Sequence, residues 1–113
     1  MSDTNIFKVV TTEEVEGYQI TESIGEVFGL VVRSRGLGGN IMAALRSIRG
    51  GEIIEYTQML EEARRHALDR MVKNAVTMGA NAVVRMQFDS SELGSTMSEI
   101  VAYGTAVVIK KKG

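Results

Sequence analysis

The sequence predicts an α+β fold in which long antiparallel strands pack on one long and one short helix. Residues 18–33 and 97–110 alternate their side chains over an unusual length, as strands do. Between them, residues 52–78 repeat apolar side chains at helical spacing. The 113 residues include no proline and match the size of one ordinary domain, so we expect a single domain over residues 1–113.

The N-terminal part predicts two strands joined by a polar turn. Residues 6–12 are rich in β-branched side chains and predict a short strand, and residues 13–17 form a turn that ends in glycine. Residues 18–33 follow as a long strand. Because the strand is so long, Gly25 and Gly29 are expected to mark bulges or bends. Alternation divides its second half into two faces: Ile24, Glu26, Phe28, Leu30 and Val32 on one, and Gly25, Val27, Gly29, Val31 and Arg33 on the other.

The stretch RSRGLGGN, residues 33–40, is predicted to join this strand to the short helix. Asn40 is a good N-cap, and Gly50 and Gly51 can end the helix. Its apolar positions recur at helical spacing: Ile41, Ala44, Leu45 and Ile48. The long helix is expected from about Glu52 to Met78, with Gly79 as its C-cap.

The C-terminal part predicts a strand over residues 81–89, a loop over residues 90–96 and a last strand over residues 97–110. In the first of these strands, Ala82, Val84, Met86 and Phe88 are expected to share the inner face. The last strand is apolar or small on both faces, and two helices cannot easily cover both sides of a four-stranded sheet. The long helix would also span about 40 Å, more than the roughly 35 Å of a compact chain of this size. We therefore expect a homo-oligomer.

Composition excludes several classes of function. The chain has no cysteine, which excludes disulfides, thiolate metal ligands and cysteine nucleophiles. A net charge of −1 argues against a general electrostatic attraction to nucleic acid or to an anionic membrane. The N-terminus does not have the pattern of a signal peptide, and no apolar run approaches the about 20 residues of a membrane span. These features predict a cytoplasmic protein without nucleic-acid or membrane partners.

The glycines of RSRGLGGN also resemble those of a phosphate-binding loop, but two positions lack the residue that such a loop requires. A Walker loop needs lysine after the last glycine, where Asn40 stands, and the dinucleotide fingerprint needs glycine or alanine where Ile41 stands. An anion could still bind at the start of the short helix beside Arg33 and Arg35. The structural alternative, a strand–turn–helix joint with permissive glycines, explains the pattern better.

Metal binding has two candidate ligands. His66 is the only histidine, and Glu62 lies one helical turn before it, so the pair could offer two ligands to a divalent metal ion. Zinc takes three or four protein ligands or waters, so further carboxylates would have to come from another strand or subunit. The alternative is a solvated pair on the helix surface.

Glu99 is the acid that we most expect to be buried, because it lies between apolar neighbours on the last strand. A buried carboxylate needs a partner, and Arg33 or Arg64 would serve. An enzyme that uses Glu99 and a neighbouring arginine is therefore a further hypothesis, although an ion pair between subunits explains the same residues. No serine lies in a nucleophile elbow.

Four stretches, in this order, resemble the YbjQ-like family of small bacterial and archaeal proteins: EGYQITESIGEVFGLVVRSRGLGGNI, GGEIIEYTQMLEEARRHAL, GANAVVRMQFD and AYGTAVVI. The family is labelled heavy-metal-binding, and its function is uncharacterised. The resemblance covers roughly residues 9–109. It implies a subunit with long curved strands, dodecin-like in shape, in a homopentameric ring. Two positions depart from the family pattern, since Asn40 stands where aspartate is common and Arg85 where glycine is common.

Taken together, these features favour a non-enzymatic oligomer that binds a small ligand or a partner at subunit junctions. The polar positions expected to contact that ligand gather at the strand–helix joint and on the long helix: Arg33, Arg35, Asn40, Glu52, Tyr56 and Arg64. A metal-binding module that uses carboxylates and His66 at subunit interfaces is the second hypothesis.

Overall fold

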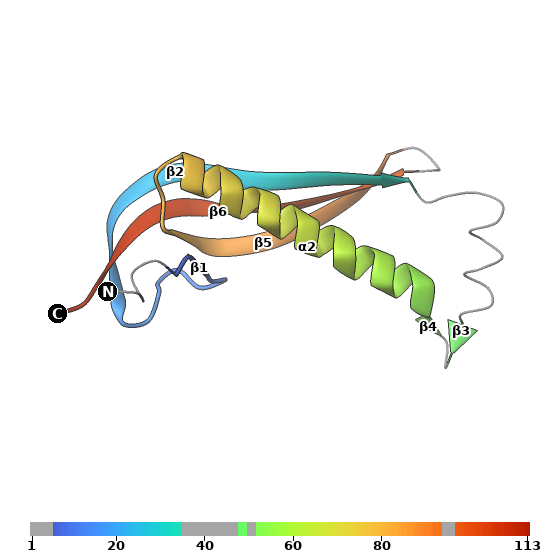
Figure 1. Cartoon of the computed structure of the whole chain (residues 1–113), viewed down its shortest axis with the longest axis horizontal. Coiled ribbons are helices and arrows are strands. Elements are labelled where there is room, and N and C mark those ends of the chain that lie inside the picture. Colours follow the sequence, from blue (N-terminus) through green and yellow to red (C-terminus); the bar gives the residue numbers. More distant parts are fainter. Residues whose placement is uncertain (1–5, 35–47, 50–51, 94–96) are drawn as a thin grey trace.

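The computed structural model describes residues 6–34, 48–49, 52–93 and 97–113, and it confirms the α+β class. A mixed four-stranded sheet with the order β1-β5-β6-β2 carries a long helix across one face (Figure 1). In the described part of the chain, no helix is both long and apolar enough to cross a membrane. The elements are β1 (Lys8–Val9), β2 (Tyr18–Ser34), β3 (Ile48–Arg49), β4 (Glu52–Ile53), α2 (Ile54–Thr77), β5 (Ala82–Leu93) and β6 (Met97–Lys111).

The two long strands confirm the alternation prediction. β2 and β6 are antiparallel from the Tyr18–Lys111 pair to the Ser34–Met97 pair. Register shifts on either side of Ser23 bend the ladder, and Gly25 has a φ of 149°, which few other residues adopt. The expected bulge at Gly25 is thus confirmed.

β5 is longer than the sequence predicted. It continues through Ser90–Leu93, which the sequence predicts as loop, because these residues pair with β6 from Ser90–Ile100 to Leu93–Met97. The polar residues SSEL have little strand propensity of their own. Their backbone is held in a strand by hydrogen bonds to the long partner strand β6. Residues 94–96 of the predicted loop lie outside the described residues.

A bulge between Val84 and Gln87 reverses the faces of β5, so the predicted shared inner face is wrong. Ala82 and Val84 pack on one side of the sheet, whereas Met86 and Phe88 pack on the other side, beneath α2. Arg85 lies in the bulge with a φ of 55°. Its N–H donates to the Thr12 carbonyl over 2.9 Å, and its guanidinium pairs with Glu13 over 2.9 Å. The segment that follows β1 therefore holds the bulge open; β1 itself is only two residues long and parallel to β5.

The start of the helical region also differs from the prediction. Ile48, expected on the short helix, and Glu52, expected in the first turn of the long helix, belong instead to the two-residue antiparallel ladder of β3 and β4. The remainder of the predicted short helix, residues 40–47, lies outside the described residues. α2 ends as predicted: Gly79 has a φ of 95°, and the N–H of Ala80 donates to the Ala75 carbonyl over 3.0 Å.

The core is built from small side chains. Beneath α2, Ala63, Ala67, Met71 and Ala75 pack on Val27, Val31, Ala102 and Ala106. A second cluster on the other side of the sheet is covered by the N-terminal segment, with Val10, Val15 and Tyr18 over Val107 and Ile109. α2 lies so close to β2 that a Cβ at Gly29 would collide with the backbone of Ala67 and Met71. Gly29 therefore serves close packing, not the bulge that the sequence suggested.

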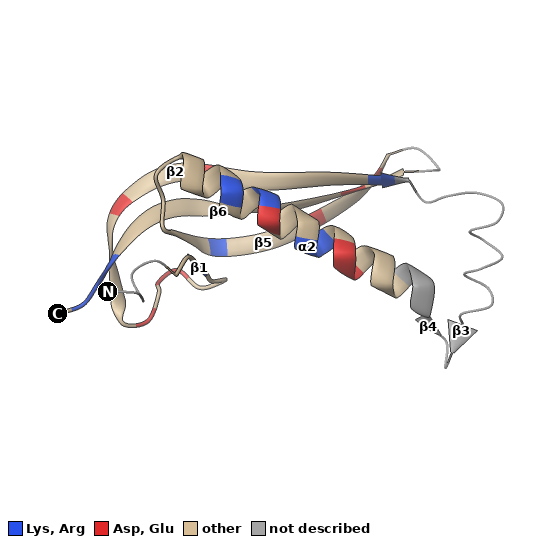
Figure 2. Ribbon diagram, viewed as in Figure 1, with Lys and Arg blue, Asp and Glu red and all other residues tan. Residues whose placement is uncertain are grey.

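One part of the sheet has no cover among the described residues. Opposite α2, the side chains of Phe28, Leu30 and Val32 are 54%, 36% and 47% exposed, beside half-buried Val101 and Tyr103 on β6. We call these five residues the outer face. The radius of gyration is 17.6 Å, against about 13 Å for a compact chain of this length. Figure 2 shows that charges gather on α2 and near the strand ends, while the middle of β2 and β6 carries few.

Candidate functional site

One side of α2 forms a polar seam with the free edge of β2. β2 is an edge strand, so half of its main-chain groups have no strand partner. Arg70 Nη1 donates to the Leu30 carbonyl over 2.7 Å, and Asn74 Nδ2 donates to the Phe28 carbonyl over 2.8 Å. One turn earlier, Arg33 Nη2 donates to His66 Nδ1 over 2.7 Å. His66, Arg70 and Asn74 lie four residues apart, which places them on one stripe of the helix.

The Arg33–His66 contact defines the state of the imidazole. Arginine has no hydrogen-bond acceptor and stays protonated, so His66 Nδ1 must accept with its lone pair and the ring proton is on Nε2. Arg33 Nε is buried and has no hydrogen-bond partner among the described residues. The guanidinium therefore occupies one of the two ring nitrogens that a metal could use, and it places a positive charge next to the ring.

The described residues of one chain do not fit a heavy-metal ion. Among the residues whose side chains the structure describes, no three His, Asp or Glu come together as a possible metal site. The whole chain has no cysteine. Glu62, the second candidate ligand, is exposed and makes no hydrogen bond to His66. The two predicted ligands are therefore not assembled into a clamp within the described subunit.

The seam gives a first testable prediction. Replacing both Arg70 and Asn74 with alanine should lower the free energy of unfolding by about 1–2 kcal/mol, since it removes two hydrogen bonds to exposed carbonyls. It should also lower the temperature at which aggregation begins, because the edge of β2 becomes available to other strands. Chemical denaturation and light scattering during heating measure the two effects.

The matched control replaces Arg65 and Lys73, two exposed cations of α2 that make no bond to β2, with alanine. If both double variants aggregate at the same temperature, the seam does not protect the edge.

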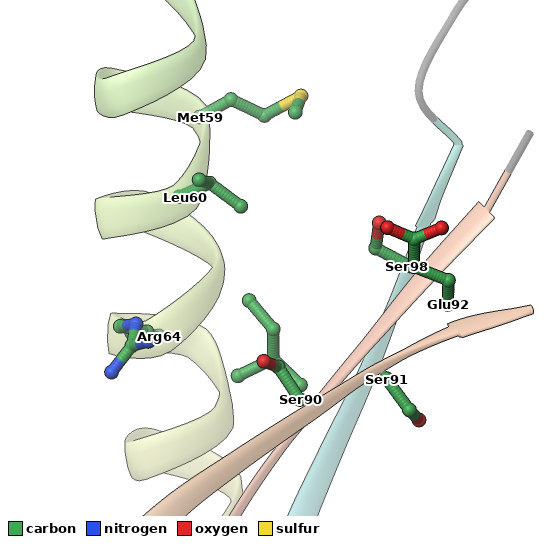
Figure 3. A pocket seen from close by; sticks show the side chains of 8 residues that line it. Met59, Leu60, Arg64, Ser90, Ser91, Glu92 and Ser98 are labelled. Atoms are coloured by element: carbon green, nitrogen blue, oxygen red, sulfur yellow. The ribbon is translucent and has the colours of Figure 1, made fainter.

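The other side of α2 borders a cleft of about 590 Å³ between the helix and the distal ends of β5 and β6. Figure 3 shows Met59 and Leu60 pointing from α2 toward the strands, with Ser90 approaching from β5 and Glu92 and Ser98 at the strand tips. Buried Ile100 contributes to the apolar wall. Ser91 lies at the rim, but its hydroxyl points to the opposite face of the sheet, where it donates to Glu99 over 3.0 Å. The cleft thus has an apolar middle and polar groups at both ends.

Arg64 is the cation of this cleft. Its guanidinium lies over the Phe88 ring, 5.1 Å from the centroid, and Phe88 packs against the main core. Among the described residues Arg64 has no carboxylate partner, so its N–H donors are available to a ligand. Exposure to solvent at the rim gives a ligand access to it.

The six predicted ligand residues do not form one cluster in the described part of the chain. Arg33 lies on the seam and Arg64 on the cleft, on opposite sides of α2. Arg35 and Asn40 lie outside the described residues, as do the side chains of Glu52 and Tyr56. The cleft residues Ser90, Ser91 and Glu92 were missed, because the sequence suggested that the strand ended at Asp89 and that the following residues were loop. Alternation continued through Ser90 would have placed Phe88 and Ser90 on one face.

Glu99 does not meet either predicted arginine. It pairs in register with Val32 and accepts from Ser91, on the sheet face opposite α2. Arg33 and Arg64 both contact residues on the α2 side. Within one described chain, the arrangement offers no carboxylate–arginine pair for catalysis at Glu99.

Known proteins resemble this chain in sequence and in fold. A family model named YbjQ and described as "Putative heavy-metal-binding" matches residues 7–110. A UPF0145 protein of Bradyrhizobium sp. (strain ORS 278) is 72% identical over 102 residues, 90% of this chain and 92% of that protein. A UPF0145 protein of Methanoregula boonei is 57% identical over 110 residues, 97% of this chain and 90% of that protein. A solved structure from Pediococcus pentosaceus, of unknown function and from the DUF74 family, has a TM-score of 0.62 at 16% identity, covering 93% of this chain and 98% of that one.

Proposed function

The chain belongs to the YbjQ family, and we propose that it acts as one subunit of a cytoplasmic homo-oligomeric ring that binds a small ligand or a partner at its subunit junctions. The ring has five subunits in this proposal, a number that rests on the family resemblance alone. In this proposal the subunit is a binding protein and not an enzyme. It binds neither nucleic acid nor membrane, since a net charge of −1 gives no general electrostatic attraction to either.

The observation that carries this proposal is the contrast between the core and the outer face. The largest fully buried side chains are Met71, Val83 and Val107, while Phe28, a larger side chain, is 54% exposed. Leu30 and Val32 continue the same apolar strip along β2. Contiguous exposed apolar residues mark interaction surfaces in soluble proteins, because water makes their exposure unfavourable.

The same geometry favours association through the face rather than through the strand edge. On β2, the carbonyls of Phe28 and Leu30 that point outward already accept from Asn74 and Arg70. A neighbouring strand would have to displace these side chains, whereas the outer face needs only to lose water. A second copy of the chain is the partner that the predicted oligomer requires.

The test is to introduce a charge on the outer face. Phe28→Asp should dissociate the oligomer into monomers at micromolar concentration, because a buried interface carboxylate without a partner is strongly unfavourable. Native mass spectrometry counts the subunits, and light scattering measures the mass in solution.

Val76→Asp is the matched control, since Val76 is 56% exposed on α2 and lies away from the outer face. It should leave the subunit number unchanged. Wild-type protein that is monomeric at micromolar concentration contradicts the proposal, and so does a Phe28→Asp variant that keeps its subunit number.

A further inference from the structure

We propose that the cleft between α2 and β5–β6 binds a small amphiphilic monocarboxylate, with its carboxylate at Arg64 and its apolar body along Met59, Leu60 and Ile100. This inference deepens the proposed small-ligand-binding function and rests on it. It identifies the chemical class of the ligand and the residues of one subunit that hold it.

The apolar middle of the cleft suits a short acyl chain or a similar body. Ile100 is 3% exposed and belongs to the core, so it gives a fixed wall, whereas Leu60 is 44% exposed on the helix side. Met59 adds an unbranched, polarizable side chain that adapts to ligands of different shape. A volume of about 590 Å³ falls within the range of small-molecule sites.

Arg64 provides the anchor for the carboxylate. The guanidinium is held over the Phe88 ring, which restricts its motion while leaving its N–H groups unused among the described residues. Its planar fork matches the two oxygens of a carboxylate, and the adjacent apolar wall strengthens a charge-assisted hydrogen bond there. The hydroxyl of Ser90, which Figure 3 shows on the strand side of the cleft, is a further donor there.

The apolar middle of the cleft restricts the ligand to one carboxylate. Beyond Arg64 the ligand lies along Met59, Leu60 and Ile100, whose side chains offer no hydrogen-bond donor to a second carboxylate. A second charge on this wall would lose its hydration without gaining a partner, which is unfavourable. A cation at one end of the cleft, followed by apolar side chains, therefore selects a monocarboxylate.

The experiment titrates the full-length, ¹⁵N-labelled protein with sodium octanoate and follows the amide signals by NMR. Signals of residues around the cleft should shift in a saturable manner. Arg64→Met should raise the Kd at least about tenfold, the loss that one charge-assisted hydrogen bond accounts for. Arg65→Met makes the same substitution one position along α2, outside the cleft, and should change the Kd less than twofold. Octanol and octanedioate, of equal chain length, should bind at least several-fold more weakly than octanoate.

Three results overturn the inference: no saturable shift with octanoate, equal losses in the Arg64→Met and Arg65→Met variants, or octanol binding as tightly as octanoate. If a neighbouring subunit fills the cleft, octanoate will produce no saturable shift, which is the first of these results. Native mass spectrometry of the same samples separates the two proposals. An intact oligomer that does not bind octanoate refutes only the carboxylate site, whereas a monomer refutes the proposed assembly whatever binds to the cleft.

Discussion

Replacing Gly29 with alanine should lower the free energy of unfolding by about 3 kcal/mol, because the added methyl group has no space. Its Cβ would overlap the Ala67 carbonyl oxygen and the Met71 nitrogen, both of them backbone atoms of α2. A flexible side chain could turn aside, but a helix backbone can only move as a unit. α2 would have to lift from β2 and break the contacts of its neighbouring alanines. Urea denaturation followed by circular dichroism measures the loss.

Gly113→Ala is the control for this prediction, since a Cβ there meets no atom within 4 Å. It should leave the denaturation midpoint unchanged. A Gly29→Ala protein with the wild-type midpoint would mean that α2 does not lie this close to β2 in solution.

The second large effect is expected from Met71→Ala, which should lower the free energy of unfolding by about 2–5 kcal/mol. Met71 is 0% exposed and is among the largest fully buried side chains, in a core made mainly of alanine and valine. Small neighbours cannot extend into the space left by the missing thioether, so a cavity remains. Urea midpoints, combined with the slope of the transition, give the change.

Met78→Ala provides a matched comparison, because it removes the same atoms from a side chain that is 38% exposed. We expect a change of less than about 1 kcal/mol, as for other surface positions. Equal losses at Met71 and Met78 would refute the small-residue core as the source of stability.

The parts of the fold that follow from local pattern could be predicted from the sequence. Alternation from Tyr18 to Arg33 and from Met97 to Lys110 predicted the bounds of β2 and β6 to within one residue. The signal is strong because successive side chains of a strand point to opposite faces of the sheet. Gly79 marked the end of α2, since a left-handed residue is needed there and glycine adopts it without strain.

The bulge in β5 could not be predicted, because its cause is distant in the chain. Arg85 has a left-handed φ without being glycine or asparagine, and the carbonyl of Thr12 stabilises it from the N-terminal segment. The bulge then exchanges the faces of every later residue in the strand.

The six ligand residues remain a prediction, and the arrangement of the two whose side chains are described, Arg33 and Arg64, did not follow from the sequence. Arg33 and Arg64 were both expected to contact the ligand, yet α2 separates them, with His66 meeting Arg33 on one side and Phe88 meeting Arg64 on the other. Helical spacing shows which residues share a stripe of α2, but it does not show which strand that stripe will meet. Only the packing of the helix over β2 decides this, and it depends on the small residues Gly29, Ala63 and Ala67.

The polar seam along β2 has a consequence for how large an assembly of this chain can become. Strand-to-strand addition has no natural end point: each new chain offers another open edge, and fibres result. Here two consecutive outward carbonyls of the exposed edge are bonded to a helix of the same chain, at Phe28 and Leu30. Growth by this route must first break those bonds in every chain that joins. Contacts between faces, fixed in number for each subunit, can instead close into a finite particle.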